Sequence, residues 1–550
     1  MFPKYISLRT LRILCFALGF GFVTTVSGQV AEKSSTLWAP FVEWSFDNPT
    51  YSGNPFDLRA TATFMHQASG TTHRTSLFYD GGTTWKLRFT GTRTGEWRFT
   101  TSSADAELDG LSGIVTIAPN NDSRIYGFLT AKNDKFALQT GENGELRGII
   151  LQVHWGAERL FKSGFTDLPT DVRDYGNAAY ITNMVQYLLD RGCNSLAINV
   201  NNQWFKAGAD SYEQHSSENP DLATFRAVET AIVTAHKLGA RIHFWLWGDE
   251  ERKWSAVGVG GINGTPDKRL QRYIAARLGP LPGWTMAYGF DLEEWVSDSQ
   301  LREWASYLQG EMGWPHLLMA RSFSNDALDV LSNDNRPTSG YYQDAVATVA
   351  AKPGRPHFYE RRFLYTRDHW DMNNTMQAFW DFAMAGGIGC SWGLFYWNST
   401  SPDYSNPEQL RTHARFWRDR LLLDLQRATN LSDGYVLKDQ ANSNFVFYKR
   451  DATSVLLKLS AMSGSQPIVA VDAKKEYAEI AVGDFSAQEL TWNAPYRSDW
   501  VLAVGRFDQQ QVEEPDDPTE IDHTAPVPPE GINVEQAPET GKRSKRSNDR

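Results

Sequence analysis

The sequence is poor in cysteine and in long apolar runs, and it carries no excess of positive charge. Three cysteines in 550 residues are too few for a disulfide framework. The 54 lysines and arginines face 65 aspartates and glutamates, which leaves a net charge of −11. A nucleic-acid partner needs a basic face, and a membrane span needs about 18 to 20 consecutive apolar residues. The sequence therefore predicts neither partner, and it leaves the oligomeric state open.

Patterns that bind metals or cofactors are also missing. The sequence has no His-Glu-x-x-His motif, EF-hand loop, phosphate-binding glycine loop or Cys-x-x-Cys pair, which are arrangements that hold zinc, calcium or nucleotides. Gly389–Gly393 matches the Gly-x-Ser-x-Gly pattern of serine hydrolases, but an aromatic segment follows it instead of the helix that this motif requires. We expect no metal ion and no organic cofactor.

Aromatic residues, in contrast, are abundant. The chain holds 20 Trp, 21 Tyr and 30 Phe, which together make up 13% of its residues. Large packed β domains use such side chains in their cores. A cleft that stacks on flat apolar surfaces, such as the faces of sugar rings, uses them as well. Composition alone therefore supports both a structural and a binding interpretation.

The two ends of the chain differ in composition from the rest. A positively charged opening precedes an apolar run over residues 13–26 and two small residues, which is the pattern of a secretory signal peptide. We predict residues 1–28 to be that peptide and the protein to be secreted or periplasmic. Residues 509–550 are rich in Pro, Glu and Asp, and a tail of this composition buries too little apolar surface to fold.

The pattern between these ends changes twice. Residues 36–120 and 431–507 contain short alternating strands broken by Gly and Asp, which is typical of β-sandwiches. From 135 to 425 strands alternate with helices in about eight units, the arrangement and size of a (β/α)8 TIM barrel. A doubly wound sheet is the rival, but no Gly-rich phosphate turn follows the first strand. The predicted fold is multidomain: a TIM barrel flanked by N-terminal and C-terminal β-sandwiches.

In such a barrel the active site lies at the carboxyl ends of the strands, so the residues that leave each strand are the candidates. Strand 4 runs into Glu293 and Glu294, and strand 7 ends at Glu360. We expect the amides, aromatic rings and charged groups at the other strand ends to bind the substrate. This set comprises His154, Trp155, Asn199, Asn202, Trp204, Trp247, Asp249, Arg321, Tyr342 and Trp392.

Each of these residues also has a purely structural explanation. Glu293 or Glu294 fits the first turn of a helix, where an acid offsets the helix dipole. Glu360 fits an ion pair with the arginine that follows it, and Trp247 fits a core layer. The functional interpretation rests on the combination of glutamates after strands 4 and 7.

This combination resembles the large clan of retaining glycoside hydrolases with a (β/α)8 barrel. In that clan the acid/base Glu after strand 4 commonly follows an Asn. Here the segment is Leu292-Glu-Glu-Trp295, which matches Glu294 by position and leaves Glu293 as the alternative. The segment Pro356–Glu360 matches the strand that carries the nucleophile. Two further positions match: Trp392 for the aromatic residue after strand 8, and Tyr341 or Tyr342 for the tyrosine that supports the nucleophile.

The N-terminal block resembles the β-sandwich of the DUF5060 type, which precedes such barrels in bacterial polysaccharide-degrading enzymes. The segments that carry this resemblance are Trp85-Lys-Leu-Arg-Phe-Thr90 and Gly95-Glu-Trp-Arg-Phe99. Among such three-domain enzymes, those that act on algal galactans such as agars and carrageenans look most similar to this chain.

The resemblance implies hydrolysis of a polysaccharide by double displacement. A protonated Glu294 would protonate the leaving oxygen while ionised Glu360 attacks the anomeric carbon, and Glu294 would then activate the water that releases the covalent intermediate. Retention of configuration requires the two carboxyl groups to lie about 5–5.5 Å apart. The charge of Glu360 and burial beside Trp295 would raise the pKa of Glu294.

Two other functions stay open. A polysaccharide lyase with Tyr or His bases would leave an unsaturated product that absorbs in the ultraviolet, which hydrolysis does not. A non-catalytic glycan-binding protein would keep its function when Glu294 and Glu360 are replaced by Ala.

Overall fold

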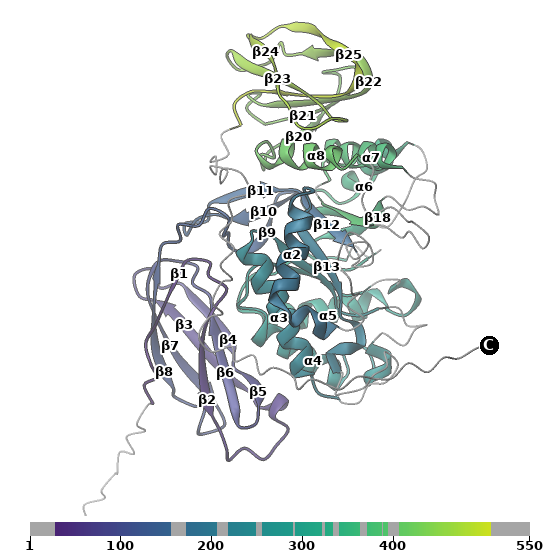
Figure 1. Cartoon of the computed structure of the whole chain (residues 1–550). Helices are drawn as coiled ribbons and strands as arrows, with labels where there is room; N and C mark the ends of the chain where they lie inside the picture. Colours follow the sequence, from purple (N-terminus) through teal and green to yellow (C-terminus); the bar gives the residue numbers. More distant parts are fainter. Residues whose placement is uncertain are drawn as a thin grey trace, which may run out of the picture. The chain divides into compact units, whose positions relative to one another are not determined.

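The computed structural model describes residues 28–155, 172–205, 218–248, 256–289, 292–321, 325–333, 340–363, 371–387, 389–393 and 406–507. These ranges all belong to one compact unit that extends to Gln509 (Figure 1). The predicted signal peptide, except for Gly28, and the predicted disordered tail lie outside the described residues.

The N-terminal part consists of two β-sheets that share one hydrophobic core. The sheet orders are β1-β8-β7-β3-β4 and β2-β6-β5. Phe64 of the first sheet stacks on Phe89 of the second, with ring centroids 4.2 Å apart, so the sheets face each other. The elements are β1 (Lys33–Thr36), β2 (Val42–Asp47), η1 (Pro55–Asp57), β3 (Ala60–His66), β4 (Thr72–Ser76), β5 (Phe78–Gly81), β6 (Thr84–Phe89), β7 (Gly95–Ser103) and β8 (Ser112–Ala118).

A three-stranded antiparallel sheet follows, which sequence reasoning missed. It is formed by β9 (Leu129–Lys132), β10 (Lys135–Gln139) and β11 (Leu146–Ile149). The sequence predicts a single strand over residues 148–153, whereas the structure divides this stretch into the end of β11 and the start of the next strand. Phe136 of β10 is buried in the same core cluster as Val153, so this small sheet belongs to the core of the α/β region.

Eight parallel strands form the central sheet, in the order β16-β15-β14-β13-β12-β19-β18-β17. Counted along the chain this order is 5-4-3-2-1-8-7-6, in which the first strand pairs with the last. The backbone N–H groups of Asp329 and Val330, just before β17, donate to the Leu318 carbonyl oxygen of β16 at 3.0 and 3.4 Å. The strands are β12 (Leu151–Trp155), β13 (Ser195–Asn199), β14 (Arg241–Trp245), β15 (Trp284–Ala287), β16 (Leu318–Met319), β17 (Leu331–Asn333), β18 (His357–Phe363) and β19 (Gly389–Gly393).

A contact across the interior shows that this sheet is strongly curved. The ring of His243 on β14 lies 5.7 Å from the ring of Phe358 on β18, although β13, β12 and β19 separate these strands in the sheet. In a flat sheet four strand spacings would place them about 19 Å apart. The two strands therefore face each other across a packed interior.

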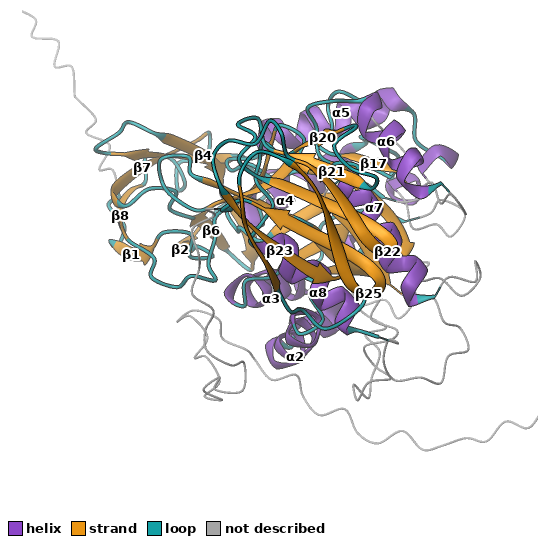
Figure 2. Cartoon of the chain, turned by 90° about the horizontal axis from the view of Figure 1, so that it is seen from above, coloured by secondary structure: helices purple, strands orange, loops and turns teal. Residues whose placement is uncertain are grey.

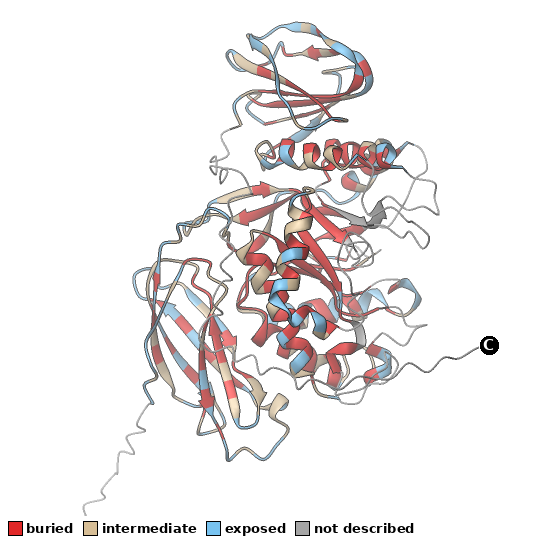
Figure 3. Ribbon diagram, viewed as in Figure 1, coloured by how far each residue is buried: buried red, intermediate tan, exposed pale blue. Residues whose placement is uncertain are grey.

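Helices connect the strands and cover the outside of the sheet (Figure 2). The predicted apolar face of α2 comprises Ile181, Met184, Val185, Leu188 and Leu189, of which the first four are buried and Leu189 is half-buried. Figure 3 shows that the described strands of the central sheet are mostly buried, whereas the helices alternate between buried and exposed residues. The elements are η2 (Val172–Gly176), α2 (Ala178–Leu189), η3 (Asn201–Phe205), α3 (Leu222–Lys237), η5 (Ala256–Val259), α4 (Thr265–Arg277), η6 (Leu292–Glu294), α5 (Asp298–Glu311), α6 (Tyr341–Ala351), α7 (Met372–Met384) and α8 (Glu408–Arg418).

The C-terminal part is one six-stranded antiparallel sheet in the order β20-β21-β22-β25-β23-β24. Its long strands β22 and β25 lie side by side (Figure 2), and their register shifts twice between Lys449 and Ser454. Leu457, beyond these shifts, shares a core cluster with Phe447, before them, so the sheet folds over its own core. The strands are β20 (Gln426–Ala428), β21 (Tyr435–Lys438), β22 (Phe445–Lys458), β23 (Gln466–Asp472), β24 (Ile480–Phe485) and β25 (Glu489–Val504).

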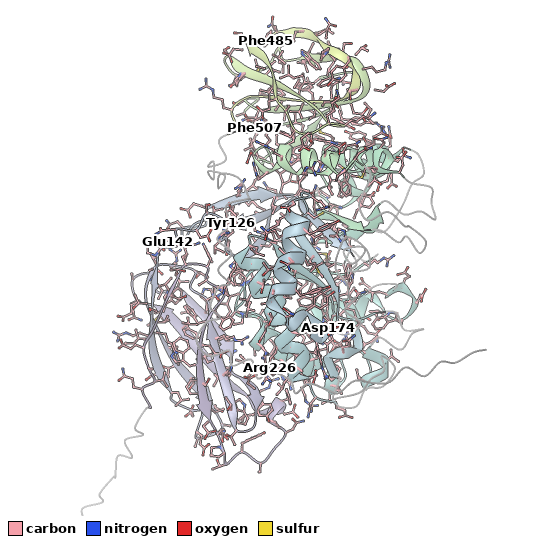
Figure 4. The ribbon with its side chains drawn as sticks, viewed as in Figure 1. Tyr126, Glu142, Asp174, Arg226, Phe485 and Phe507 are labelled. Carbon is pink, nitrogen blue, oxygen red and sulfur yellow. The ribbon has the colours of Figure 1, made fainter. Side chains whose placement is uncertain are left out.

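A buried cluster of charges joins the N-terminal sheets to α3 and α4. Glu229 of α3 forms ion pairs with Arg88 of β6 and Arg277 of α4, and all three side chains are buried. Arg277 also contacts Asp80 at 2.9 Å, and Arg226 of α3 donates to the Asp80 carbonyl oxygen at 3.1 Å (Figure 4). Burial alone would raise the pKa of Glu229, but Arg277 and Arg88 hold it below its usual value.

Replacing Glu229 with Gln removes the charge that Arg88 and Arg277 share inside the protein. We expect the variant to lose about 3–5 kcal/mol of unfolding free energy, measured by chemical denaturation. The matched control is Arg98→Ala, which breaks an ion pair with Glu96 whose side chains are 58% and 42% exposed, and which should cost less than about 1 kcal/mol. Equal losses in the two variants would contradict a structural role for the buried cluster.

Candidate functional site

Because neighbouring strands of the central sheet are parallel, their carboxyl ends lie along one edge. His154 is buried on β12, and Asn199 is exposed at the last position of β13. Arg321 is half-buried two residues after β16. Glu294 follows β15 as the last residue of η6. The structure thus brings these four predicted residues to the ends of strands 1, 2, 5 and 4.

Other predicted residues lie outside what the structure describes. Asp249 is one of them, as are the side chains of Trp155, Asn202, Glu360 and Trp392. The backbone of Glu360 belongs to β18 and that of Trp392 to the neighbouring β19. In the strand register the Trp392 Cα is opposite His154 of β12. Strands 1, 8 and 7 are therefore neighbours.

Two tryptophans that the sequence predicts to bind substrate are core residues instead. Trp204 and Trp247 have no exposed surface. The Trp204 indole N–H donates to the Leu246 carbonyl oxygen at 2.8 Å, and Trp247 stacks on Phe205 with centroids 6.0 Å apart. Rings enclosed by protein in this way have no face left for a sugar, so packing is their role here.

The tyrosine pair after strand 6 also needs a correction. The sequence predicts the sixth strand to end near Tyr341 and Tyr342, but β17 ends at Asn333 and the pair opens α6. Tyr342 stacks on Tyr435 of the C-terminal sheet, with centroids 3.6 Å apart and rings 6° from parallel, so its ring is occupied. Tyr341 is buried with its ring 5.8 Å from that of Tyr359 on β18, and it is the better match for a residue beside strand 7.

The segment that carries Glu293 and Glu294 is a separate turn ahead of α5. Both glutamates are exposed, whereas Leu292 between them and β15 is buried in the main core. Helix α5 has Ser297 as its N-cap, with a complete capping box to Gln300 and Asp298 in its first turn. The two glutamates therefore precede the helix, and the alternative that they serve as its first-turn acids does not apply.

A close backbone approach fixes the start of this segment. The Trp247 N–H donates to the Tyr288 carbonyl oxygen at 2.8 Å, which extends the pairing of β14 and β15 beyond the strands. At Gly289, the next residue, a Cβ atom would lie 2.8 Å from the Trp247 carbonyl oxygen and 3.0 Å from Leu292. Only glycine fits there without a shift of the backbone. Sequence reasoning missed this residue because a glycine after a strand also suits any ordinary turn.

Asp267, in the first turn of α4, is the second residue that sequence reasoning missed. Its carboxylate is fully buried and accepts hydrogen bonds from the Asn263 backbone N–H at 2.8 Å and the Trp247 indole N–H at 3.3 Å. Burial raises its pKa to about 6, which the hydrogen bonds from Asn263 and Trp247 only partly offset. From the sequence this residue was indistinguishable from an ordinary helix-start acid.

Within the described ranges, no three or more His, Cys, Asp or Glu side chains are grouped closely enough to hold a metal ion. No helix among the same residues has the length and apolar character needed to cross a bilayer. Cys193 is a free, buried thiol, as the sequence predicts, and burial raises its pKa to about 12.

Comparisons with known proteins agree with this architecture. Residues 36–104 match the family DUF5060, a domain of unknown function, which confirms the resemblance of the N-terminal block. No curated protein matched the chain. A candidate glycoside hydrolase from Bacteroides vulgatus ATCC 8482 is similar in structure, with 16% identity, a TM-score of 0.57, and coverage of 86% of this chain and 100% of that one.

A glycoside hydrolase of family 5 from the same strain is similar as well. It has 14% identity and a TM-score of 0.53, over 69% of this chain and 94% of that one. At such identities the similarity establishes a common fold.

Replacing Gly289 with Ala should push the Trp247 carbonyl and the Glu294 segment apart. We expect a loss of about 1–3 kcal/mol of unfolding free energy, as for other overpacked sites. Gly310 in α5 is the matched control, because a Cβ atom there meets nothing within 4 Å, and Gly310→Ala should stabilise the protein by about 0.4–1 kcal/mol. A Gly289→Ala protein as stable as the wild type would refute the close approach.

Proposed function

We propose that this protein is a glycoside hydrolase that cleaves a polysaccharide by a retaining double displacement. Glu294 is the acid/base and Glu360 the nucleophile. In this reaction Glu294 first protonates the leaving oxygen and then, as a base, activates water, while Glu360 forms the covalent bond to the anomeric carbon.

One observation supports the proposal most. Glu294 lies in η6, the first element after the fourth parallel strand, β15. Glu360 lies in the seventh strand, β18, of a sheet whose first and last strands pair. The carboxyl ends of parallel strands share one edge, where the active sites of (β/α)8 enzymes lie. Both similar solved structures are named as glycoside hydrolases. The exposure of Glu294 on η6 suits a group that must reach a substrate.

We infer that the central sheet closes into a (β/α)8 barrel flanked by two β-sandwiches. The hydrogen bonds from Asp329 and Val330 to Leu318 and the contact of His243 with Phe358 across the interior support closure. The facing N-terminal sheets and the folded C-terminal sheet support the flanking domains. The signal-peptide pattern over residues 1–28 supports export of the protein, and polysaccharide substrates lie outside the cell.

The substrate in this proposal is an algal galactan such as agar or carrageenan. Asn199, exposed at the end of strand 2, is the proposed partner for sugar hydroxyl groups, and His154 near the end of strand 1 is buried. Trp155, Asn202, Asp249 and Trp392 are further candidates from the sequence. Arg321 after strand 5 suits an anionic group such as a sulfate, because a guanidinium binds such oxygens in a fork.

The proposal is tested by incubating the purified protein with a panel of plant and algal polysaccharides and following reducing ends. Glu294→Ala and Glu360→Ala should each lower the rate on the best substrate by a factor of about 100 or more. Glu293→Ala is the matched control, an exposed glutamate in the same turn, and should retain activity. Loss of activity in Glu293→Ala and not in Glu294→Ala would show that Glu293 is the acid/base.

The same panel separates the alternative functions. A product with ultraviolet absorbance would identify a lyase and overturn the hydrolytic mechanism. Binding of a polysaccharide that is unchanged in both Ala variants, with no new ends formed, would identify a glycan-binding protein. A product whose first-formed anomer is inverted would overturn the assignment of Glu360 as a nucleophile.

A further inference from the structure

Asp267 accepts hydrogen bonds from two residues, and these two residues contact opposite ends of the segment that carries Glu294. It is the third residue of α4 and has no exposed surface. Its two carboxylate oxygens accept from two different donors, the Trp247 indole and the Asn263 backbone. The two donors lie at opposite ends of the connection between β14 and α4, before and after η5, and each contacts a different end of the segment from Gly289 to Gln300.

The first connection runs through Trp247. Its indole N–H is held by the Asp267 Oδ1 atom at 3.3 Å. The Trp247 backbone N–H pairs with Tyr288 at 2.8 Å, and the Trp247 carbonyl oxygen lies where a side chain at Gly289 would be. A shift of Trp247 would therefore displace the backbone at Tyr288 and Gly289, ahead of η6.

The second connection runs through Asn263. Its backbone N–H donates to the Asp267 Oδ2 atom at 2.8 Å, and its φ of 57° is in the left-handed region that Asn tolerates. The Asn263 side-chain amide donates to the Gln300 carbonyl oxygen at 3.0 Å. Gln300 completes the capping box of α5, so this contact holds the backbone that leaves the Glu294 segment.

We propose that Asp267 is a positioning residue that holds the Glu294 turn in place from both ends, through Trp247 and Asn263. The inference rests on the proposed role of Glu294 as acid/base. Asp267 does not touch the reacting atoms, and it affects the reaction only by fixing the position of the Glu294 turn. A displacement of a catalytic group by about 1 Å is enough to cost a factor of about 100 in rate.

Asp267→Asn is the sharpest substitution because it changes one hydrogen bond and almost no volume. Each carboxylate oxygen accepts from one of these N–H donors, and an amide offers only one oxygen. One of the two contacts must therefore place an NH₂ group against an N–H group. Trp247→Phe is a second variant, which keeps an aromatic ring in the core but removes the indole donor. Because Phe is smaller and Trp247 is fully buried, it also leaves a cavity, whose cost should fall on both substrates alike.

The experiment compares two substrates of the same sugar in the wild type and the variants. One is the polysaccharide that the wild type cleaves best, whose leaving alkoxide needs a proton from the acid. The other is the 2,4-dinitrophenyl glycoside of the released sugar unit, whose leaving group departs without one. The measured quantity is kcat/KM, because it reports the steps up to departure of the leaving group and excludes the later step in which Glu294 acts as a base.

We expect Asp267→Asn and Trp247→Phe to lower kcat/KM on the polysaccharide by about 10- to 100-fold and on the dinitrophenyl glycoside by less than about threefold. The double variant should lose less than the product of the two single losses, because both substitutions act on the hydrogen bonds of one carboxylate. Equal losses on both substrates would overturn the proposal, since a general structural defect does not depend on the leaving group.

Asp329→Asn is the matched control for the stability cost. Asp329 is a half-buried carboxylate that also accepts a backbone N–H, from Leu318 at 2.9 Å, together with the Gln309 amide at 3.2 Å. Neither Asp329 nor these two donors belongs to the segment from Gly289 to Gln300. This variant should melt earlier and lower kcat/KM on both substrates by the same small factor.

The two proposals fail in different ways. If Glu294→Ala cleaves the polysaccharide as fast as the wild type, the acid/base assignment falls, and the role of Asp267 falls with it. If Glu294→Ala is impaired on the polysaccharide and spared on the dinitrophenyl glycoside while Asp267→Asn is not, the acid/base stands and only the positioning role is overturned.

Discussion

The pairing of β12 with β19 is the constraint on which the rest of the α/β region depends, because it joins the first parallel strand to the last. The register is continuous, from Leu151 opposite Gly389 to Trp155 opposite Gly393. The two paired strands are separated by more than 230 residues along the chain. The long-range order then follows: strand 8 lies beside strand 1 and strand 7 beside strand 8, and their carboxyl ends share an edge with strands 2 to 5.

The sequence predicted the elements of this region well where a local period defines them. The apolar face of α2 and a helix from Asp371 to Ala385 are both predicted from spacing and residue type, and the structure has α7 between these two residues. Short elements were the exception. The strand β17 has three residues, Leu331–Asn333, which is too few for a two-residue period to be recognised. The prediction therefore moved the sixth strand toward the tyrosine pair that opens α6.

The candidate site also has features that the sequence predicts and features that it does not. The order of strands and helices was enough to single out the segments after strands 4 and 7, because the chain order in a barrel fixes which ends meet. What the side chains do there depends on contacts between distant parts of the chain. The burial of Trp204 and Trp247, the stacking of Tyr342 on Tyr435, and the hydrogen bond from Trp247 to Asp267 are set by tertiary packing, and none leaves a pattern in the residues nearby.

The ion pairs of Glu229 have an evolutionary consequence as well as an energetic one. Arg88 comes from the N-terminal sheets and Arg277 from α4, while Glu229 comes from α3, so three separate stretches of chain share one solvent-excluded charge balance. A substitution that reverses the charge at any one of these positions leaves the buried charges unbalanced, and only a second substitution in the cluster can restore the balance. Among related sequences these positions should be inherited as a set, and the N-terminal sheets should be retained or lost together with the surface of α3 and α4 that they cover.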